Sequence, residues 1–217
     1  MIGSLFGLGA PPLDDARWVI LDVETSGLDP SRDRLLAIAA LAVHLAPGRG
    51  PALPLADSFE LVLRQPQEAA LQPPDRPNIL LHGIGLGAQQ RGVGRREALL
   101  AFGAYVGQAP LLAFHAAFDR TLIERAFDAE GLAVPPNPWL DLAPLAAVLR
   151  PDIRARSLDE WLAALQIRCA VRHQAAADTL ATAELLLKLW PALRAQHPEP
   201  RFADAHRLAA LRRWLPP

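Results

Sequence analysis

Short apolar runs alternate with polar or Pro- and Gly-rich segments in the early part of the chain. Residues 17–23 contain an apolar run that starts at Trp18 and leads into an acidic turn. Residues 35–45 are apolar almost throughout. The alanines of the second run make a helix a competitor, but the prolines and glycines that follow it favour a strand. Residues 56–64 alternate apolar and polar side chains, which is typical of a strand. The three runs predict an antiparallel meander.

The pattern of the remaining chain is mostly helical. Residues 65–78 are rich in Gln and Pro and indicate a loop, and residues 78–85 form a small apolar segment that ends in a His-Gly turn. Helical apolar spacing, glycine stop signals and a capping box at Ser157 and Glu160 predict the helices. These helices cover residues 97–106, 119–130, 141–148, 157–165, 175–194 and 202–214, with short buried strands at 110–114 and 139–140.

The order of these elements predicts the fold class. Strands come first and helices mostly later, with one strand-helix-strand passage, so we expect an α/β domain with a central mixed sheet of about five strands flanked by helices. We divide the chain into a flexible N-terminal arm at 1–15, a main domain at 16–195, and a C-terminal helical extension at 196–217 that packs on the domain.

Composition and charge restrict what the domain can bind and where it works. The net charge is -1, whereas proteins that grip nucleic acid through phosphates alone are usually basic. A polyanion would therefore be held locally, by metal ions or by a small arginine cluster. Cys169 is the only cysteine, which excludes an internal disulfide. The N-terminus makes a poor signal peptide and no apolar run approaches the roughly 20 residues that span a bilayer, so we expect a cytoplasmic protein without membrane contact.

Acidic residues stand where predicted strands meet loops or helices. Asp22 and Glu24 end the first strand, and its alternation places both on one face. Two adjacent carboxylates repel each other and resist desolvation, and a divalent cation between them relieves both costs. Asp119 follows another strand, and Asp178 lies in the first turn of the long helix. His173 precedes Asp178 by five residues, about 140° around a continuous helix, so the two converge only if His173 lies on the approaching loop.

The order of these motifs resembles one enzyme family. A DxE at a strand end, an FD after a strand and an H-x4-D at a helix start are similar to the DEDDh group of 3′–5′ exonucleases, the family of the proofreading epsilon subunit of bacterial DNA polymerase III. The matching segments are residues 22–28, 115–119 and 173–178, with a His-Gly-Ile segment at 82–84. The resemblance covers residues 17–190. It implies a ribonuclease H-like fold, with residues 16–195 as the exonuclease domain.

The resemblance implies a phosphodiesterase that uses two Mg²⁺ or Mn²⁺ ions, which prefer hard oxygen ligands. Asp22 and Asp178 would bind the principal ion, with Asp22 bridging to the second. Glu24 would complete the shell, and Asp119 would bind the second ion through water. His173 would be the general base for the attacking water. The implied reaction releases nucleoside 5′-monophosphates from the 3′ end of single-stranded DNA.

The same resemblance assigns a pocket for the terminal nucleotide. Backbone groups at Thr25 and Ser26 would reach the 3′-hydroxyl, Gly27 completes the turn, and Leu28 would wedge beside the last base. His82 is either a substrate contact or a structural turn residue.

Some polar residues near these motifs have other roles or open ones. His115, with Phe114 before it, stands where family members commonly carry His-Asn, so we expect activity to survive with an altered substrate choice. Asp141 is assigned to helix capping and left out of the catalytic set. Additional phosphate contacts from arginines are left open; the candidates are Arg120, Arg172 and the group Arg91, Arg95 and Arg96.

Two alternatives stay open at this point. One is an exonuclease of the same superfamily that acts on RNA or oligonucleotides, because the metal chemistry ignores the 2′-hydroxyl. The other is a catalytically silent binding subunit associated with a polymerase, which the intact acids argue against. The expected partner is the 3′ end of a single-stranded nucleic acid. Association with a DNA polymerase and the oligomeric state are left open.

Overall fold

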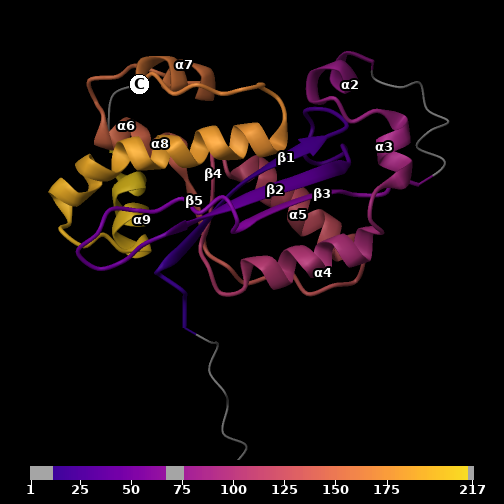
Figure 1. Ribbon diagram of the computed structural model, residues 1–217, viewed down its shortest axis with the longest axis horizontal. Helices are drawn as coiled ribbons and strands as arrows, with labels where there is room; N and C mark the ends of the chain where they lie inside the picture. The colour runs from indigo at the N-terminus through magenta and orange to yellow at the C-terminus, as the bar shows by residue number, and fades with distance from the viewer. Residues whose placement is uncertain (1–11, 67–75, 215–217) are drawn as a thin grey trace, which may run out of the picture.

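One mixed five-stranded sheet forms the centre of the protein, as the computed structural model shows for residues 12–66 and 76–214 (Figure 1). The strands are β1 (Arg17–Thr25), β2 (Leu35–His44), β3 (Ser58–Val62), β4 (Leu111–Ala113) and β5 (Trp139–Asp141), in the order β3-β2-β1-β4-β5. The first three strands make the predicted antiparallel meander, and β4 and β5 continue from β1 in parallel. β1 therefore lies at the centre, where the antiparallel and parallel halves meet.

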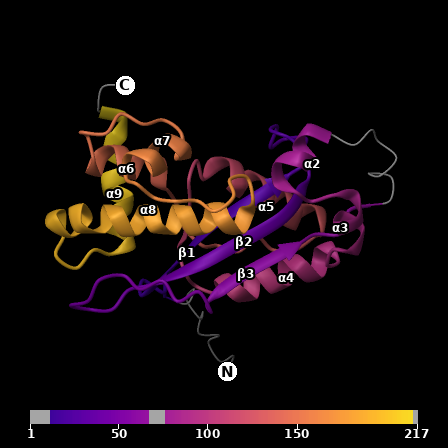
Figure 2. The same cartoon turned by 45° about the horizontal axis from the view of Figure 1, so that its top comes forward.

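Helices cover both faces of this sheet. They are α2 (Arg76–His82), α3 (Leu86–Arg91), α4 (Arg95–Val106), α5 (Ala117–Ala129), α6 (Leu142–Leu149), α7 (Leu158–Ala164), α8 (Ala175–Gln196) and α9 (Phe202–Ala210), followed by a 3₁₀ turn at Leu211–Trp214. α4 and α5 pack on one face, and α6, α8 and α9 pack on the other (Figures 1 and 2). This layered arrangement confirms the predicted fold class. None of the described helices is long and apolar enough to cross a lipid bilayer.

The side chains of β1 alternate between these two layers. Val19, Leu21 and Val23 enter the core beneath α4 and α5, whereas Trp18 and Ile20 enter the core beneath α8. Period-two alternation continues the second row into positions 22 and 24. The acids at these two positions therefore share the face that α8 covers.

The alanines of β2 let α8 approach the sheet closely. Ala37 and Ala39 are buried, and they are the β2 residues that pair with the two acidic positions of β1. On α8, the Thr179 hydroxyl donates a hydrogen bond of 3.3 Å to the carbonyl oxygen of Ala39. Small side chains leave room for a helix to lie near the strand backbone. The N-terminal turns of α8 are thus held over the end of β1.

Several elements differ from their sequence predictions. The apolar segment at 78–85 is a helix, α2, that ends at His82, and Gly83 follows with a φ of 75°. The helix α3 was not predicted, because six residues with two polar glutamines show no clear apolar period. The final predicted helix changes to 3₁₀ geometry at Leu211. The capping box at Ser157 is confirmed.

Asp15, the last residue of the predicted arm, connects the start of β1 with the predicted C-terminal extension. Its carboxylate accepts a 2.7 Å hydrogen bond from the backbone N–H of Phe202, the first residue of α9. Trp18 packs edge-on against Trp190 of α8 and Phe202, with ring centroids 5.6 and 5.9 Å apart. The backbone N–H of Asp14 also donates to the carbonyl of Gln108, at 2.9 Å. Residues 1–11 of the predicted arm, residues 67–75 of the predicted loop and residues 215–217 lie outside the described part of the chain.

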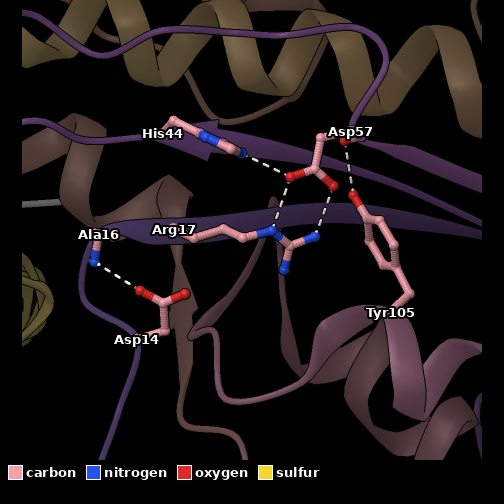
Figure 3. Close-up of polar contacts among 6 residues, drawn as sticks. All are labelled: Asp14, Ala16, Arg17, His44, Asp57 and Tyr105. Carbon is pink, nitrogen blue, oxygen red and sulfur yellow. Dashed lines mark hydrogen bonds and ion pairs between the residues drawn. The ribbon is translucent and has the colours of Figure 1, made fainter.

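A cluster around Asp57 holds the start of β1, at the opposite end from the acids (Figure 3). Arg17 donates two hydrogen bonds to the Asp57 carboxylate, at 2.9 and 2.8 Å, and His44 Nε2 lies 2.6 Å from the same group. The Tyr105 hydroxyl donates to the Asp57 carbonyl at 2.9 Å, and the Arg17 guanidinium lies 4.7 Å from the Tyr105 ring centroid. The Arg17 guanidinium, followed by His44, lowers the pKa of the Asp57 carboxyl. The cluster fastens β1, β2, the segment before β3 and α4 together.

Candidate active site

Acidic side chains from three elements gather at the C-terminal end of β1. Asp22 and Glu24 belong to β1, Asp119 to the first turn of α5, and Asp178 to the first turn of α8. Asp119 and Asp178 are almost completely buried, with 4% and 5% of their surface exposed. The structure therefore brings together the four carboxylates that the sequence motifs single out.

Burial and mutual repulsion disturb the ionisation of these groups. The pKa of Asp22 is well above its ordinary value because the group is desolvated and faces the charges of Asp119, Glu24 and Asp178. Burial, followed by the charge of Asp178, raises the pKa of Glu24 to about 8. Burial is also the main cause that raises the pKa of Asp119 to about 8. Such a cluster attracts positive charge.

Backbone N–H groups fix several of the carboxylates in place. The N–H of Ala175, at the start of α8, donates to Glu24 and thereby moderates the rise of its pKa. The backbone N–H of His173 donates to Asp178 Oδ2 at 3.0 Å. The second oxygen of Glu24, Oε1, is buried and has no hydrogen-bond partner. A buried carboxylate oxygen without a partner is costly, so this atom is available to a ligand.

A loop residue, Arg172, supplies the positive charge next to this cluster. Its guanidinium forms ion pairs with Asp178 and with Asp159 of α7. The Cys169 thiol lies 3.4 Å from Asp178 Oδ1, where it can donate a weak hydrogen bond. Neither contact could be predicted from the sequence, because Asp159 and Cys169 lack any motif spacing to Asp178. Arg172 was only one of several open candidates for a phosphate contact.

His173 lies on the loop before α8, as the spacing to Asp178 predicts. Its side chain is exposed, and its backbone has a φ of 63°, in the left-handed region that few non-glycine residues adopt. The hydrogen bond from its N–H to Asp178 offsets part of the cost of this conformation. The backbone of His173 is thus fixed beside Asp178, while its side chain stays open to solvent.

The predicted nucleotide pocket is a turn organised by Asp33. The Ser26 hydroxyl donates to Asp33 Oδ1 at 2.9 Å, and the backbone N–H of Asp29 donates to Asp33 Oδ2 at 2.8 Å. The Thr25 hydroxyl donates to the carbonyl of Gly27 at 2.5 Å. A Cβ atom added at Gly27 would lie 2.6 Å from Asp33 Oδ2, so this position has no room for a side chain. Sequence reasoning missed Asp33, although a Ser-Asp pair around a turn is a usable signal.

Leu28 projects from this turn with 88% of its surface exposed. Between Glu24 and Thr25 the pairing of β1 with β2 shifts register, so that Thr25 pairs with Leu35. Such an irregularity is a β-bulge, which bends the strand locally. The acids therefore belong to the regular ladder, whereas the turn with Leu28 leaves the sheet in its own direction.

The two remaining predicted contact residues lie on neighbouring turns. His82 is buried at the end of α2, and its Nδ1 accepts a 2.9 Å hydrogen bond from the backbone N–H of Ile84. The following Gly83 lies beside Gln174 of the loop that leads to α8. His115 is exposed after β4 with a φ of 63°.

Asp141 fixes the backbone at His115 and also begins α6. Its Oδ1 accepts hydrogen bonds from the backbone N–H groups of His115 and Ala143, both at 3.0 Å. The predicted capping role of Asp141 is therefore confirmed. Its charge also raises the pKa of Asp119, which links the cap to the acid cluster electrostatically.

The donor set of the cluster suits divalent cations that prefer oxygen. Four carboxylates provide hard ligands, and the orphaned Oε1 of Glu24 shows that one ligand atom is unused by the protein. Among the described residues, no three His, Cys, Asp or Glu side chains are drawn together closely enough to coordinate an ion. Binding would therefore require side-chain adjustment. Arg172 is the nearest competitor for Asp178.

The sheet order, its helical layers and the acids at the end of β1 define a ribonuclease H-like domain, the fold of exonuclease I. A solved structure of exonuclease I superposes with a TM-score of 0.66 and 18% sequence identity, over 90% of this chain and 42% of that chain. Exonuclease I from E. coli in complex with a dT13 oligonucleotide gives a TM-score of 0.65 and 18% identity, over 83% of this chain and 43% of that chain.

Sequence relatives connect the chain with DNA polymerase III proteins. A DNA polymerase III subunit epsilon-like protein from Rhodobacter capsulatus is 32% identical over 208 residues, which are 89% of this chain and 26% of the relative. A PolC-type DNA polymerase III from Latilactobacillus sakei is 26% identical over 185 residues, 85% of this chain and 12% of the relative. No family model matches the chain. These relatives confirm the resemblance to DnaQ-like exonucleases, and the chain spans 26% and 12% of their lengths.

Proposed function

We propose that the protein is a metal-dependent 3′–5′ exonuclease that hydrolyses the terminal phosphodiester bond of single-stranded DNA and releases nucleoside 5′-monophosphates. The observation that carries the proposal is the cluster of four acids from β1, α5 and α8, whose raised pKa values show how strongly it lacks positive charge. The similarity to epsilon-like and PolC-type proteins, and the fold of exonuclease I, support the same reaction.

Divalent cations, Mg²⁺ or Mn²⁺, complete this site in the proposal. Asp22, Glu24, Asp119 and Asp178 would hold them. When bound, the ions would supply positive charge for the scissile phosphate and its leaving group. A solved structure with the same fold is the zinc-bound form of an E. coli exonuclease I complex with single-stranded DNA. It supports the binding of a divalent ion in this fold.

The protein's own residues would position the substrate and move the proton. His173 is exposed beside Asp178 and would accept the proton of the attacking water at a ring nitrogen. Thr25 and Ser26 would reach the 3′-hydroxyl from the turn that Asp33 holds, with Gly27 allowing close approach. The exposed Leu28 would pack against the terminal base.

In the same proposal, His82 and His115 also contact the substrate. The buried position of His82 suits a supporting role, whereas the exposed His115 is free to meet an incoming strand. The chain matches only part of the length of its DNA polymerase III relatives. Association with a DNA polymerase and action in the cytoplasm are therefore further parts of this proposal.

The test is a degradation assay on 5′-labelled and 3′-labelled single strands, with DNA and RNA of one sequence. We expect stepwise shortening from the 3′ end in Mg²⁺ or Mn²⁺, release of 5′-monophosphates, faster decay of DNA than RNA, and no activity in EDTA. If RNA is degraded faster than DNA, the preferred substrate is RNA and not DNA. Activity undiminished in EDTA would refute the metal mechanism.

Substitutions test the assignment of the site itself. Asp22→Asn and Asp119→Asn should lower kcat by about a thousandfold or more, since each removes a charge that the reaction needs. Asp128→Asn is the matched control, because Asp128 is exposed on the same helix as Asp119. An Asp22→Asn variant as active as this control would mean that the nuclease activity resides elsewhere.

A further inference from the structure

Arg172 makes a contact that the proposed reaction does not use. Its guanidinium pairs with Asp178, a proposed metal ligand, and with Asp159, which lies in the first turn of α7. The Asp178 side chain is 7% exposed and the Arg172 side chain 25% exposed, whereas the Asp159 side chain is 60% exposed. Arg172 thus connects a buried carboxylate to one at the surface.

The charge of Arg172 reaches beyond its direct partner. It lowers the pKa of Asp22 and of Glu24, against the larger opposing effects of burial and of the other acids. Among the described residues, Arg172 is the cation whose charge lowers the pKa of both β1 carboxylates. A buried cluster of like charges is costly unless a counterion accompanies it. Arg172 is that counterion.

The same Asp178 oxygen, Oδ1, that pairs with Arg172 also receives the Cys169 thiol contact, whereas Oδ2 is occupied by the His173 N–H. Both oxygens of Asp178 are therefore engaged by the protein. A cation that binds Asp178 through Oδ1 must displace the guanidinium or the thiol, since these two contacts use both lone pairs of that oxygen. The guanidinium is the partner that has a second carboxylate to pair with.

We propose that Arg172 is an exchangeable counterion of the acid cluster, which pairs with Asp178 in the metal-free protein and retreats to Asp159 when a divalent cation binds. The proposal rests on the metal site of the proposed function. Competition for Oδ1 of Asp178 makes the arginine and the metal ion mutually exclusive at that oxygen, and linkage requires that removal of either one favours the other. Arg172 is a positioning residue in this scheme, and Asp159 is its acceptor in the metal-bound state.

Binding of Mn²⁺ measured by titration calorimetry tests the exchange directly, without an activity assay. Arg172→Gln should bind Mn²⁺ about three- to tenfold more tightly than the unchanged protein, since the ion no longer competes with a partly buried pair. Asp159→Asn should bind Mn²⁺ about two- to threefold more weakly, because the displaced guanidinium has lost its second partner. Arg168→Gln, an equal charge change at an exposed position of the same loop, is the control.

Thermal unfolding in EDTA supplies a second measurement. Arg172→Gln should melt below Arg168→Gln in EDTA, because the acids lose their counterion, and saturating Mn²⁺ should close that gap. Mn²⁺ affinity of Arg172→Gln equal to that of Arg168→Gln, or weaker, would overturn the exchange while the metal site stands. Absence of Mn²⁺ binding by the unchanged protein would overturn the proposed function and the exchange together.

Discussion

The acid cluster makes the stability of the metal-free protein fall as pH rises. Asp119 has an ordinary pKa of 3.8, which describes the unfolded chain, and a pKa of about 8 in the folded protein. Between these values the folded protein keeps a proton that the unfolded chain has released. The contribution of Asp119 to the free energy of unfolding is therefore complete below about pH 4 and is lost progressively as the pH rises to about 8.

The magnitude follows from the size of this window. Each pH unit inside it costs about 1.4 kcal/mol for one group, so the interval from pH 5 to pH 8 costs about 4 kcal/mol from Asp119. Glu24, with a pKa raised from 4.5 to about 8, acts in the same direction, but the two acids share one cluster and their effects do not add. A loss of this size lowers the melting temperature of a domain this long by roughly 10 °C.

Melting temperatures measured in EDTA from pH 5 to pH 8 check this expectation. Asp119→Asn should flatten the decline, because an amide does not ionise, whereas the control Asp128→Asn should keep it. Saturating Mn²⁺ should flatten the decline in the unchanged protein as well, since the ion stabilises the ionised carboxylates. Equal slopes for Asp119→Asn and Asp128→Asn would refute the reasoning.

Two further substitutions test how the site is supported. Asp57→Ala removes the bidentate partner of Arg17 and should lower the free energy of unfolding by about 1–2 kcal/mol in urea titrations at pH 7, with no change in the slope against urea. An unchanged midpoint would show that the pair contributes nothing. Gly27→Ala should raise KM for single-stranded DNA severalfold, because the added Cβ displaces Asp33, whereas Gly50→Ala, where no atom lies within 4 Å of an added Cβ, should leave KM unchanged.

The sequence predicted the meander and the acid positions because both depend on local patterns. A short apolar run identified β1, and the period of two along a strand placed Asp22 and Glu24 on one face. The glycines and prolines after β2 correctly outweighed the helical preference of its alanines. The sequence analysis missed what those alanines indicate, which is that their small side chains allow α8 to lie close to the strand.

Contacts between distant segments could not be predicted. Asp57 lies 40 residues from Arg17, and no periodicity relates the two. The pairing of Arg172 with Asp159 and Asp178 requires the loop before α8 to fold back on α7, which depends on tertiary packing. The short helix α3 was missed because helices of one or two turns are stabilised by their surroundings more than by their own sequence.

The bulge after Glu24 separates two different structural settings within a few residues. The carboxylates stand in the regular ladder with Ala37 and Ala39, so any change there disturbs the centre of the sheet. The turn beyond the bulge is held by its own hydrogen bonds to Asp33, and Leu28 at its tip is exposed. A replacement of Leu28 therefore leaves the ladder around Asp22 and Glu24 unchanged, so the proposed nucleotide pocket can be altered without disturbing the proposed metal site.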